Sequence, residues 1–487
     1  RRVLFRSYAV DSDITRAIRD LAPRFDNRLF LSATPHNGHS NSFSALLEIL
    51  DPVRFTRGVP VSGKDALAPI MVRRLKRDLR QLGVENFPRR LLVQHRLEYV
   101  SNEGWERKEL VYDSEKLSAS EALRVSPSEK LDGGPDTELR LAELLARYTE
   151  LSAPKKGRGR LPFIRLQQRL LSSPEAFART LERHAESVLR SGALSASAQR
   201  SFALTDDAID PELHGLHDDA MEAEAEAEMA RASSELLAPA EEARAILDEM
   251  RTLAENARRR PDAKVRALLA WMRANLHPGI GLGEGESSGG EWSDRRVILF
   301  TEWADTMRYL QEILSEAVAQ TGASEGRIRV FHGGMGDEAR DELQRAFNSP
   351  PDRDPVRILI ATDAAREGIN LQAHCADLFH MDLPWNPARL EQRNGRIDRT
   401  LQPSPEVRCH YFVYPQRVED RILETLVRKV EIIQTELGSL GAVLLDEVER
   451  SLEGGLREEL TEVIEAIGKD TSTQVVEEEL EAQRDDL

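Results

Sequence analysis

The chain has 487 residues, of which 31% are charged and 5% aromatic, and it carries a formal net charge of −17. This length allows about two to four domains, and no apolar run approaches the roughly 18 residues that a membrane-spanning helix needs. The two cysteines, Cys375 and Cys409, are too few for a disulfide framework or a zinc site. We therefore predict a helix-rich cytoplasmic protein with no membrane partner and no metal centre.

Negative charge is concentrated near the carboxyl-terminal end, where residues 441–487 hold 15 acidic and 4 basic side chains. An acidic total argues against a surface coated for nucleic-acid binding, although it leaves room for a basic cleft. The cluster Arg73-Arg74-Leu75-Lys76-Arg77 is a candidate lining for such a cleft. On charge alone, a solvated helix face is the simpler interpretation of that cluster.

The first region, residues 8–95, is predicted to contain a helix at 14–25 and an apolar strand at 28–31. The small-residue turn Ser32-Ala33-Thr34-Pro35 follows, and a helix is predicted at 42–50. The turn is almost uninformative by itself and gains weight only from its surroundings.

The second region, residues 96–260, is rich in Glu, Ala, Leu and Arg, so we expect it to be mostly helical. Within it, Met221 to Glu228 alternates Glu with Ala. Strict alternation gives a helix no apolar stripe. We expect an exposed helix or a disordered linker there, without chemistry.

The third region, residues 261–415, alternates short apolar runs with helical segments. Strands are predicted at 296–300, 328–331, 356–360, 378–381 and 407–413, and helices near 304–318, 337–348 and 387–395. This alternation is typical of an α/β fold in which helices cover both faces of a parallel sheet. The last region, 416–487, is predicted to be an acidic helical tail.

The helix near 387–395 is predicted to carry a cluster of polar side chains on one face. Gln392, Arg396 and Arg399 follow one another at i, i+4 and i+7. Guanidinium groups are always charged and fit phosphate oxygens in a bidentate manner. The two arginines are therefore candidates for stabilising a phosphoryl-transfer transition state.

The same residues also have a purely structural interpretation. Arg-rich helices are common, and Arg396 could pair with Glu391, or Arg399 with Asp398, on a solvent-facing helix. In isolation this interpretation is the better one, so the choice depends on motifs elsewhere in the chain.

Polar residues also follow two of the predicted strands. In a parallel α/β sheet, ligands bind at the carboxyl ends of the strands. The residues expected at such ends are Thr362, Asp363, Arg366, Glu367 and Gly368 after one strand, and His332 after another. Ordinary loops with tight turns explain Gly333-Gly334 equally well, and explain the longer block less well.

Five segments appear in the order of helicase motifs III to VI. They are Ser32 to Gly38, Phe300 to Glu302, His332 to Met335, Ala361 to Gln372, and Gln392 to Arg399. Together they resemble the Swi/Snf-type branch of superfamily 2 helicases, including bacterial RNA-polymerase-recycling ATPases and DISARM-like defence helicases. The resemblance covers 8–95 and 261–430 well and 96–260 loosely.

This resemblance implies an α/β fold and a division of the chain into four parts. The parts are the end of a first RecA-like lobe at 8–95, a helical insertion at 96–260, a second RecA-like lobe at 261–415 and the acidic tail at 416–487. Arg396 and Arg399 match arginine fingers, whereas Gln392, Asp363 and Gly368 match ATP-binding positions. Positions that match nucleic-acid contact or coupling are Ser32, Thr34, Thr301, His332, Thr362 and Arg366.

The sequence departs from the family in one respect. In this family, a phosphate loop, Gly-x-x-x-x-Gly-Lys-Ser/Thr, and an acidic Asp-Glu pair precede the Ser-Ala-Thr turn. Neither motif occurs before Ser32 in this sequence. Val61 to Asp65 lacks the first glycine and the hydroxyl residue, and Asp446-Glu447 lies on the wrong side of the motor. We therefore expect an amino-terminally truncated piece of a longer ATP- and Mg²⁺-dependent enzyme, inactive by itself.

The resulting hypothesis is part of an ATP-dependent translocase that moves on double-stranded DNA. The resemblance alone suggests RNA polymerase or phage-defence proteins as partners. The alternative is a non-catalytic interaction fragment that docks partners through 96–260 and the acidic tail. An RNA helicase ranks below both, because the insertion and the segment Arg73 to Asp78 match the Swi/Snf-type branch.

Overall fold

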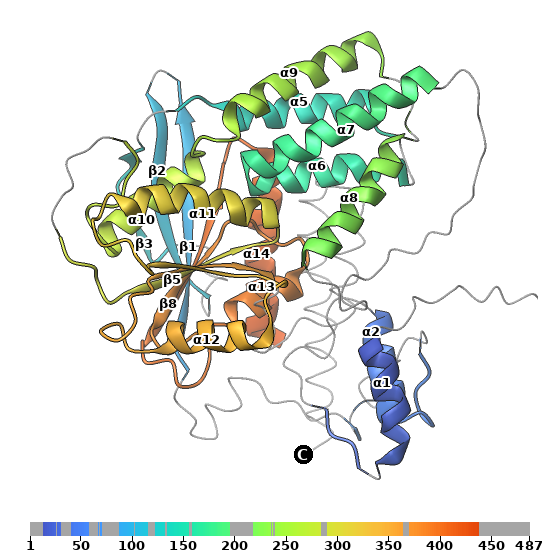
Figure 1. Cartoon of the computed structure of the whole chain (residues 1–487), viewed down its shortest axis with the longest axis vertical. Coiled ribbons are helices and arrows are strands. Elements are labelled where there is room, and N and C mark those ends of the chain that lie inside the picture. Colours follow the sequence, from blue (N-terminus) through green and yellow to red (C-terminus); the bar gives the residue numbers. More distant parts are fainter. Residues whose placement is uncertain are drawn as a thin grey trace, which may run out of the picture.

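The computed structural model describes fifteen stretches of the chain, shown in colour in Figure 1. They are residues 13–25, 27–30, 40–57, 67, 69–70, 87–101, 103–114, 122–131, 134–154, 158–194, 218–234, 236, 239–283, 290–363 and 370–437. Among these stretches, the search for a helix both long and apolar enough to span a bilayer finds none.

Among the described residues, a single sheet of nine strands forms the centre of the fold, in the order β3-β2-β1-β9-β8-β5-β7-β6, with β4 paired to β2. The strands are β1 Arg89–Val100, β2 Gly104–Asp113, β3 Arg124–Val125, β4 Glu129–Lys130, β5 Arg296–Thr301, β6 Ile328–Phe331, β7 Ile358–Thr362, β8 Cys375–His380 and β9 Glu406–Val413. Within this order, the neighbouring pairs β1–β9, β9–β8, β8–β5, β5–β7 and β7–β6 are all parallel, whereas β2 pairs with β1 in the antiparallel sense. The prediction of an α/β fold with a parallel sheet is confirmed.

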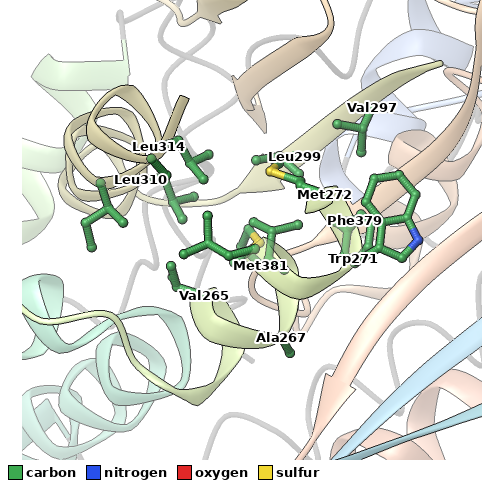
Figure 2. Close-up of a cluster of buried hydrophobic side chains, with 14 of the residues drawn as sticks. Val265, Ala267, Trp271, Met272, Val297, Leu299, Leu310, Leu314, Phe379 and Met381 are labelled. Atoms are coloured by element: carbon green, nitrogen blue, oxygen red, sulfur yellow. The ribbon is translucent and has the colours of Figure 1, made fainter. Parts of the chain in front are cut away.

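Helices cover both faces of this sheet (Figure 1). One face packs against α10 Ala263–Asn275 and α11 Ala304–Ala319, and the other against α12 Asp337–Asn348, α13 Pro387–Asn394 and α14 Val418–Leu437. Every residue of β5 and of β7 is buried, which explains their continuous apolar runs. Figure 2 shows the α10 side of the core, where Trp271 meets Phe379 edge-on at 5.0 Å between ring centroids.

A bundle of five helices precedes α10 and has a hydrophobic core of its own. Its members are α5 Thr137–Ser152, α6 Leu161–Ser172, α7 Pro174–Leu194, α8 Asp218–Ser234 and α9 Glu241–Ala257. At its centre, buried His184 lies 2.9 Å from the Tyr148 hydroxyl and 2.9 Å from the Ser233 hydroxyl. The alternating segment from Met221 to Glu228 lies within α8 and is helical.

Two expectations about the earlier part of the chain are wrong. The boundary placed after residue 95 falls inside β1, because β1 and β2 extend the sheet of the second lobe. The described residues between 96 and 136 therefore form strands β1 to β4 and their connections, and α-helix begins with α5. The strand predicted at 28–31 is also absent from its described residues, 28–30. Arg28 instead donates to the carbonyls of Ala22 and Ile49, and so ties the 3-10 turn Ala22–Arg24 after α1 (Asp13–Leu21) to α2 (Ser40–Leu50).

Candidate functional site at the carboxyl ends of the strands

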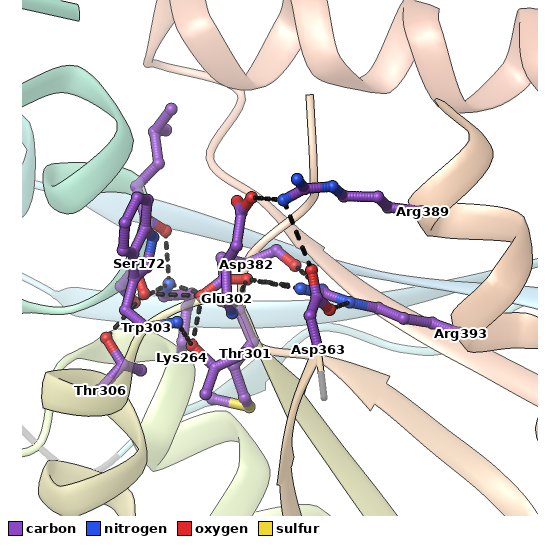
Figure 3. A network of polar contacts seen from close by, with 12 residues as sticks. Ser172, Lys264, Thr301, Glu302, Trp303, Thr306, Asp363, Asp382, Arg389 and Arg393 are labelled. Carbon is purple, nitrogen blue, oxygen red and sulfur yellow. Dashed lines mark hydrogen bonds and ion pairs between the residues drawn. The ribbon is translucent and has the colours of Figure 1, made fainter. Parts of the chain in front are cut away.

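Neighbouring strands β8, β5 and β7 end side by side, because they run parallel. Thr301 at the end of β5 pairs in register with Thr362 at the end of β7, and Phe300 pairs with His380 of β8. The polar residues that follow these strands converge in one network, which Figure 3 shows from close by. This is the edge at which parallel α/β sheets bind their ligands.

Asp382, just beyond β8, is the centre of this network. Its Oδ2 accepts hydrogen bonds from Thr301 Oγ1 at 2.5 Å and from Ser172 Oγ at 2.6 Å, and its Oδ1 accepts from the Glu302 amide at 2.9 Å. Ser172 belongs to the helical bundle, so one carboxylate joins the bundle to two strand ends. Sequence reasoning did not select Asp382, because nothing local distinguishes it from other loop acids.

Arg393, on α13, is the cation at the centre of the network, and its side chain is 0% exposed. Its Nε donates to Asp363 Oδ1 at 2.6 Å, and its Nη1 donates to the Asp382 carbonyl at 2.8 Å. Burial acts to lower the pKa of Arg393, but the charges of Asp363 and Asp382 outweigh it and raise the pKa. The charge is therefore permanent, and it fixes α13 against the ends of β7 and β8.

Asp363 was predicted to contact ATP, and the network gives it a different environment. Its carboxylate binds Arg393, and Arg389 Nη1 lies 3.8 Å from its other oxygen. Arg389 also donates to Glu302 Oε1 at 2.7 Å. A carboxylate repels phosphate, so we interpret Asp363 as a residue that positions Arg393.

The helix predicted at 387–395 ends at Asn394, so Arg396 and Arg399 do not share a helix with Gln392. Gly395 follows, and the amides of Arg396 and Ile397 turn back to carbonyls three residues earlier. Each guanidinium is nevertheless tied through Nε to a carbonyl four residues earlier. Arg396 donates to the Gln392 carbonyl at 3.2 Å and Arg399 to the Gly395 carbonyl at 2.6 Å.

Arg399 also donates through Nη1 to the Asn370 side chain, which lies in the segment after β7. Its half-buried position lowers its pKa through desolvation. This contact joins the two motifs that sequence analysis placed together, one after β7 and one at the end of α13.

The carboxylates that could have neutralised the two arginines bind another partner. Arg90 of β1 makes a bidentate pair with Glu391, at 2.7 and 2.8 Å, and its Nε donates to Asp398 at 2.7 Å. The structural alternative had assigned Glu391 to Arg396 and Asp398 to Arg399. Arg90 lies some three hundred positions away in the chain, so no sequence spacing could have indicated it.

The remaining predicted residues are spread over this edge of the sheet. Thr301 is 0% and Thr362 is 1% exposed, so neither hydroxyl offers a surface to nucleic acid. His332 lies in the loop after β6, and its Nδ1 accepts from the Gly334 amide at 3.2 Å. Predicted residues and segments that lie outside the described residues are Ser32, Thr34, Arg366, Gly368, 73–78 and 441–487.

A buried lysine joins the helical bundle to the same edge. Lys264 of α10 donates to the carbonyls of Leu171 at 2.7 Å, Ser172 at 2.5 Å and Met381 at 2.8 Å (Figure 3). The first two carbonyls end α6, where a cation is favourable. Burial lowers the pKa of Lys264. The bundle is therefore attached to the strand ends through Lys264 and Ser172 together.

The environment of His380, at the end of β8, leads us to predict that the stability of the folded protein depends on pH. Its Nε2 lies 2.9 Å from the Asn394 amide oxygen, and burial, with the charge of Arg393, lowers its pKa from 6.5 to about 3. The unfolded chain takes up a proton below pH 6.5 and the folded one does not, so stability should fall as the pH falls from 6.5 towards 3. We expect His380→Gln to reduce this slope by up to about 1.4 kcal/mol per pH unit.

Urea unfolding of both proteins at several values in this pH range measures the slope. Buried His184, whose pKa burial lowers to about 4, contributes in the same direction. It remains in both proteins and provides the background. Equal slopes for the wild type and the variant would contradict the assignment to His380.

A family model, "Helicase conserved C-terminal domain", matches residues 291–400. "Uncharacterized ATP-dependent helicase YqhH" of Bacillus subtilis (strain 168) is 38% identical over 151 residues, which are 31% of this chain and 25% of that protein. "Defense against restriction protein B" of Escherichia phage P1 is 39% identical over 82 residues, 17% of this chain and 4% of that protein. "RNA polymerase-associated protein RapA" of Yersinia enterocolitica (serotype O:8 / biotype 1B, strain NCTC 13174 / 8081) is 35% identical over 109 residues, 22% of this chain and 10% of that protein.

The residues that match the helicase carboxyl-terminal domain, 291–400, include the strand ends and the arginines of this network. These matches agree with the resemblance to superfamily 2 helicases of the Swi/Snf-type branch that the motifs indicated. The chain spans a quarter or less of the length of each of these three relatives.

ATP with Mg²⁺ is the cofactor that this superfamily implies, and the lobe fits one end of it. Arg396, which is 6% exposed, and Arg399, which is partly exposed, hold guanidinium groups anchored through Nε, and such groups suit the phosphate end of a nucleotide. In the described residues, no phosphate-binding loop accompanies them, and the carboxylates of Asp363 and Asp382 are engaged by Arg393. The residues of this lobe therefore suit ATP as positively charged partners of its phosphates.

Proposed function

We propose that this chain is the second lobe of an ATP-driven motor that moves along double-stranded DNA. The observation that carries the proposal is the anchoring of Arg396 and Arg399 beside the carboxyl ends of parallel strands. A guanidinium held in this way matches the arginine-finger device of nucleotide hydrolases. The phosphate cradle, in this proposal, comes from residues other than those of this lobe.

In this proposal most residues take the roles that the motif resemblance implies. Arg396 and Arg399 approach the terminal phosphate, and Gln392 and Gly368 lie next to the nucleotide. His332 and Arg366 contact the nucleic-acid backbone, whereas Ser32 and Thr34 transmit the hydrolysis step. Because Thr301 is buried against Asp382, it acts in coupling the strand ends to α13 and not in direct nucleic-acid contact.

The names of two relatives bear on the setting of this motor. One is described as RNA polymerase-associated and one as a defence protein of a phage. Both settings involve duplex DNA, which supports DNA over RNA as the track. We infer that the partner is RNA polymerase or a protein of a restriction or phage-defence system.

ATP hydrolysis by this chain and by a longer polypeptide tests the proposal. The longer polypeptide places a segment with a phosphate loop and an Asp-Glu pair before residue 32. We expect the longer protein to hydrolyse ATP faster when duplex DNA is added, and the 487-residue chain to show no such turnover. A phosphate-release assay measures both.

Duplex RNA of the same sequence and length serves as the control track. Equal stimulation by RNA and DNA would contradict the assignment of DNA as the track. ATP hydrolysis by the 487-residue chain alone would contradict the proposal that the phosphate cradle comes from residues outside this lobe. A longer protein that binds partners but never hydrolyses ATP would support the scaffold alternative.

A further inference from the structure

The turn between α6 and α7 of the helical bundle is buried against the strand ends of the sheet. Its two serines, Ser172 and Ser173, are each 1% exposed. They lie against Thr306 of α11 and, through Ser172, against Asp382 (Figure 3). Burying a hydroxyl is unfavourable unless it is hydrogen-bonded, so the partners of these serines show what the turn holds in place.

The hydrogen bonds of these hydroxyls can run in one direction only. Ser172 Oγ donates its single hydrogen to Asp382 Oδ2 at 2.6 Å. Thr306 Oγ1, 2.7 Å from Ser172 Oγ, must therefore donate to Ser172, and Ser173 Oγ, 2.8 Å from Thr306 Oγ1, must donate to Thr306. The row of hydroxyls ends on the Asp382 carboxylate, and hydrogen bonds in such a row strengthen one another.

Lys264 holds the main chain on both sides of the bond between Ser172 and Asp382. Its ammonium group donates to the Ser172 carbonyl at 2.5 Å and to the carbonyl of Met381, the residue before Asp382, at 2.8 Å. The side-chain bond and the main-chain bonds therefore fix the same two segments. A change in the position of Ser172 is passed directly to Asp382.

Asp382 in turn holds α13. Arg393 Nη1 donates to the Asp382 carbonyl at 2.8 Å, and both terminal nitrogens of Arg393 lie 3.4 Å from Asp382 Oδ1. The same helix anchors Arg396, whose Nε donates to the Gln392 carbonyl at 3.2 Å. A displacement of Asp382 therefore moves the helix on which Arg396 is anchored.

A second set of contacts leads from α6 to the same helix. Arg169 lies over the Trp303 ring, 4.0 Å from its centroid, and pairs with Asp305 at 3.5 Å. Glu302, next to Trp303, accepts from Arg389 of α13 at 2.7 Å. Both arginines that hold α13 at the strand ends therefore bind residues that the bundle contacts directly or through a neighbour.

We propose, on the basis of the motor function above, that Ser172 is a positioning residue for ATP hydrolysis. Its hydroxyl orients Asp382, Asp382 holds Arg393, and α13 thereby presents Arg396 and Arg399 to the nucleotide. The helical bundle controls the rate of hydrolysis through this one turn. Small displacements of such groups suffice, because misplacement by about 1 Å can slow a reaction about a hundredfold.

Hydrogen exchange of the 487-residue chain, followed by mass spectrometry, tests the step from Ser172 to α13 without ATP. Ser172→Ala removes one hydroxyl and leaves Asp382 its bonds from Thr301 and from the Glu302 amide. We expect the α13 amides to exchange about fivefold faster, or more, in this variant than in the wild type. The amides of buried β7 should exchange at the wild-type rate.

Ser173→Ala is the matched control, because it removes a hydroxyl of the same size and burial one position away. In the described part of the chain this hydroxyl bonds to Thr306 and to the Ala176 amide, and not to Asp382. Thr306 keeps its own hydrogen for Ser172. The α13 amides of Ser173→Ala should therefore exchange at the wild-type rate.

Steady-state hydrolysis by the longer ATP-hydrolysing polypeptide tests the effect on the rate. Ser172→Ala should lower kcat about fivefold or more, whereas KM for ATP and Kd for duplex DNA should stay within about twofold. This split is expected because the change acts on arginines that stabilise the transition state. Ser173→Ala should keep the wild-type kcat.

Three exchange results would overturn the inference. They are wild-type exchange of α13 in Ser172→Ala, equal acceleration in Ser173→Ala, and an equal acceleration of β7, which would indicate a loss of global stability. Faster exchange of α13 with an unchanged kcat would overturn the control of rate by the bundle. Failure of the longer wild-type protein to hydrolyse ATP contradicts the proposed function instead, and the exchange of α13 still decides whether Ser172 positions that helix.

Discussion

Arg393→Met is expected to lower the free energy of unfolding by about 3–5 kcal/mol, the usual cost of breaking a buried ion pair by removing one partner. Arg393 is fully buried, and its loss leaves Asp363 and Asp382 without their common cation. Methionine fills much of the same volume, so the cost is electrostatic and not that of a cavity. Urea unfolding at pH 7, followed by tryptophan fluorescence, measures the change.

Arg353→Met is the matched control, because Arg353 is exposed on the same lobe. It should change the free energy of unfolding by less than about 0.5 kcal/mol, as is usual for surface substitutions. Adding Asp363→Asn to Arg393→Met should restore part of the lost stability, since one unpaired charge is removed. If Arg393→Met lowers the free energy of unfolding by less than about 1 kcal/mol, the ion pairs of Arg393 do not stabilise the fold as we propose.

Arg396→Ala and Arg399→Ala, made in the longer ATP-hydrolysing polypeptide, are expected to lower kcat by about 10³-fold or more if each acts as an arginine finger. The chemical step needs a planar, bidentate cation, so lysine at either position should restore little activity. Affinity for duplex DNA should stay within twofold, because the arginines act on the nucleotide in our proposal. Single-turnover ATP hydrolysis and DNA binding by fluorescence anisotropy measure the two quantities.

Arg345→Ala provides the control for these variants. Arg345 lies on α12, where its Nε donates to the Asp341 carbonyl four residues earlier, as in the two candidate fingers. It should leave kcat unchanged. If Arg396→Ala and Arg399→Ala retain wild-type kcat, both residues are structural ties and the catalytic proposal fails.

The local elements of the second lobe followed directly from the sequence. The helix predicted at 337–348 and the strand predicted at 328–331 have the predicted limits, and the other strands shift by only a few residues. Short apolar runs between helical segments leave few alternatives to a parallel sheet covered on both faces. The order of the motifs then indicated the family.

The partners of the site residues could not be predicted in this way. Arg90 binds Glu391 and Asp398 across the interface between β1 and α13, and Ser172 reaches Asp382 from the helical bundle. Such pairs depend on which strands become neighbours, and a periodic pattern says nothing about that. The end of α13 was also misplaced by one residue, because the helix ends at Asn394 and the amides of Arg396 and Ile397 bond to carbonyls three residues earlier.

The sequence by itself determined the parallel α/β lobe, its family and the presence of two arginines near a strand end, because these depend on local periodicity and motif order. Only the tertiary structure decided that Arg393 clamps Asp363, that β1 belongs to the sheet, and that Arg396 and Arg399 are tied through Nε to nearby carbonyls. The physical reason is that ion pairing and burial depend on distances in space, and the residues concerned are brought together by strand order, which sequence separation does not encode.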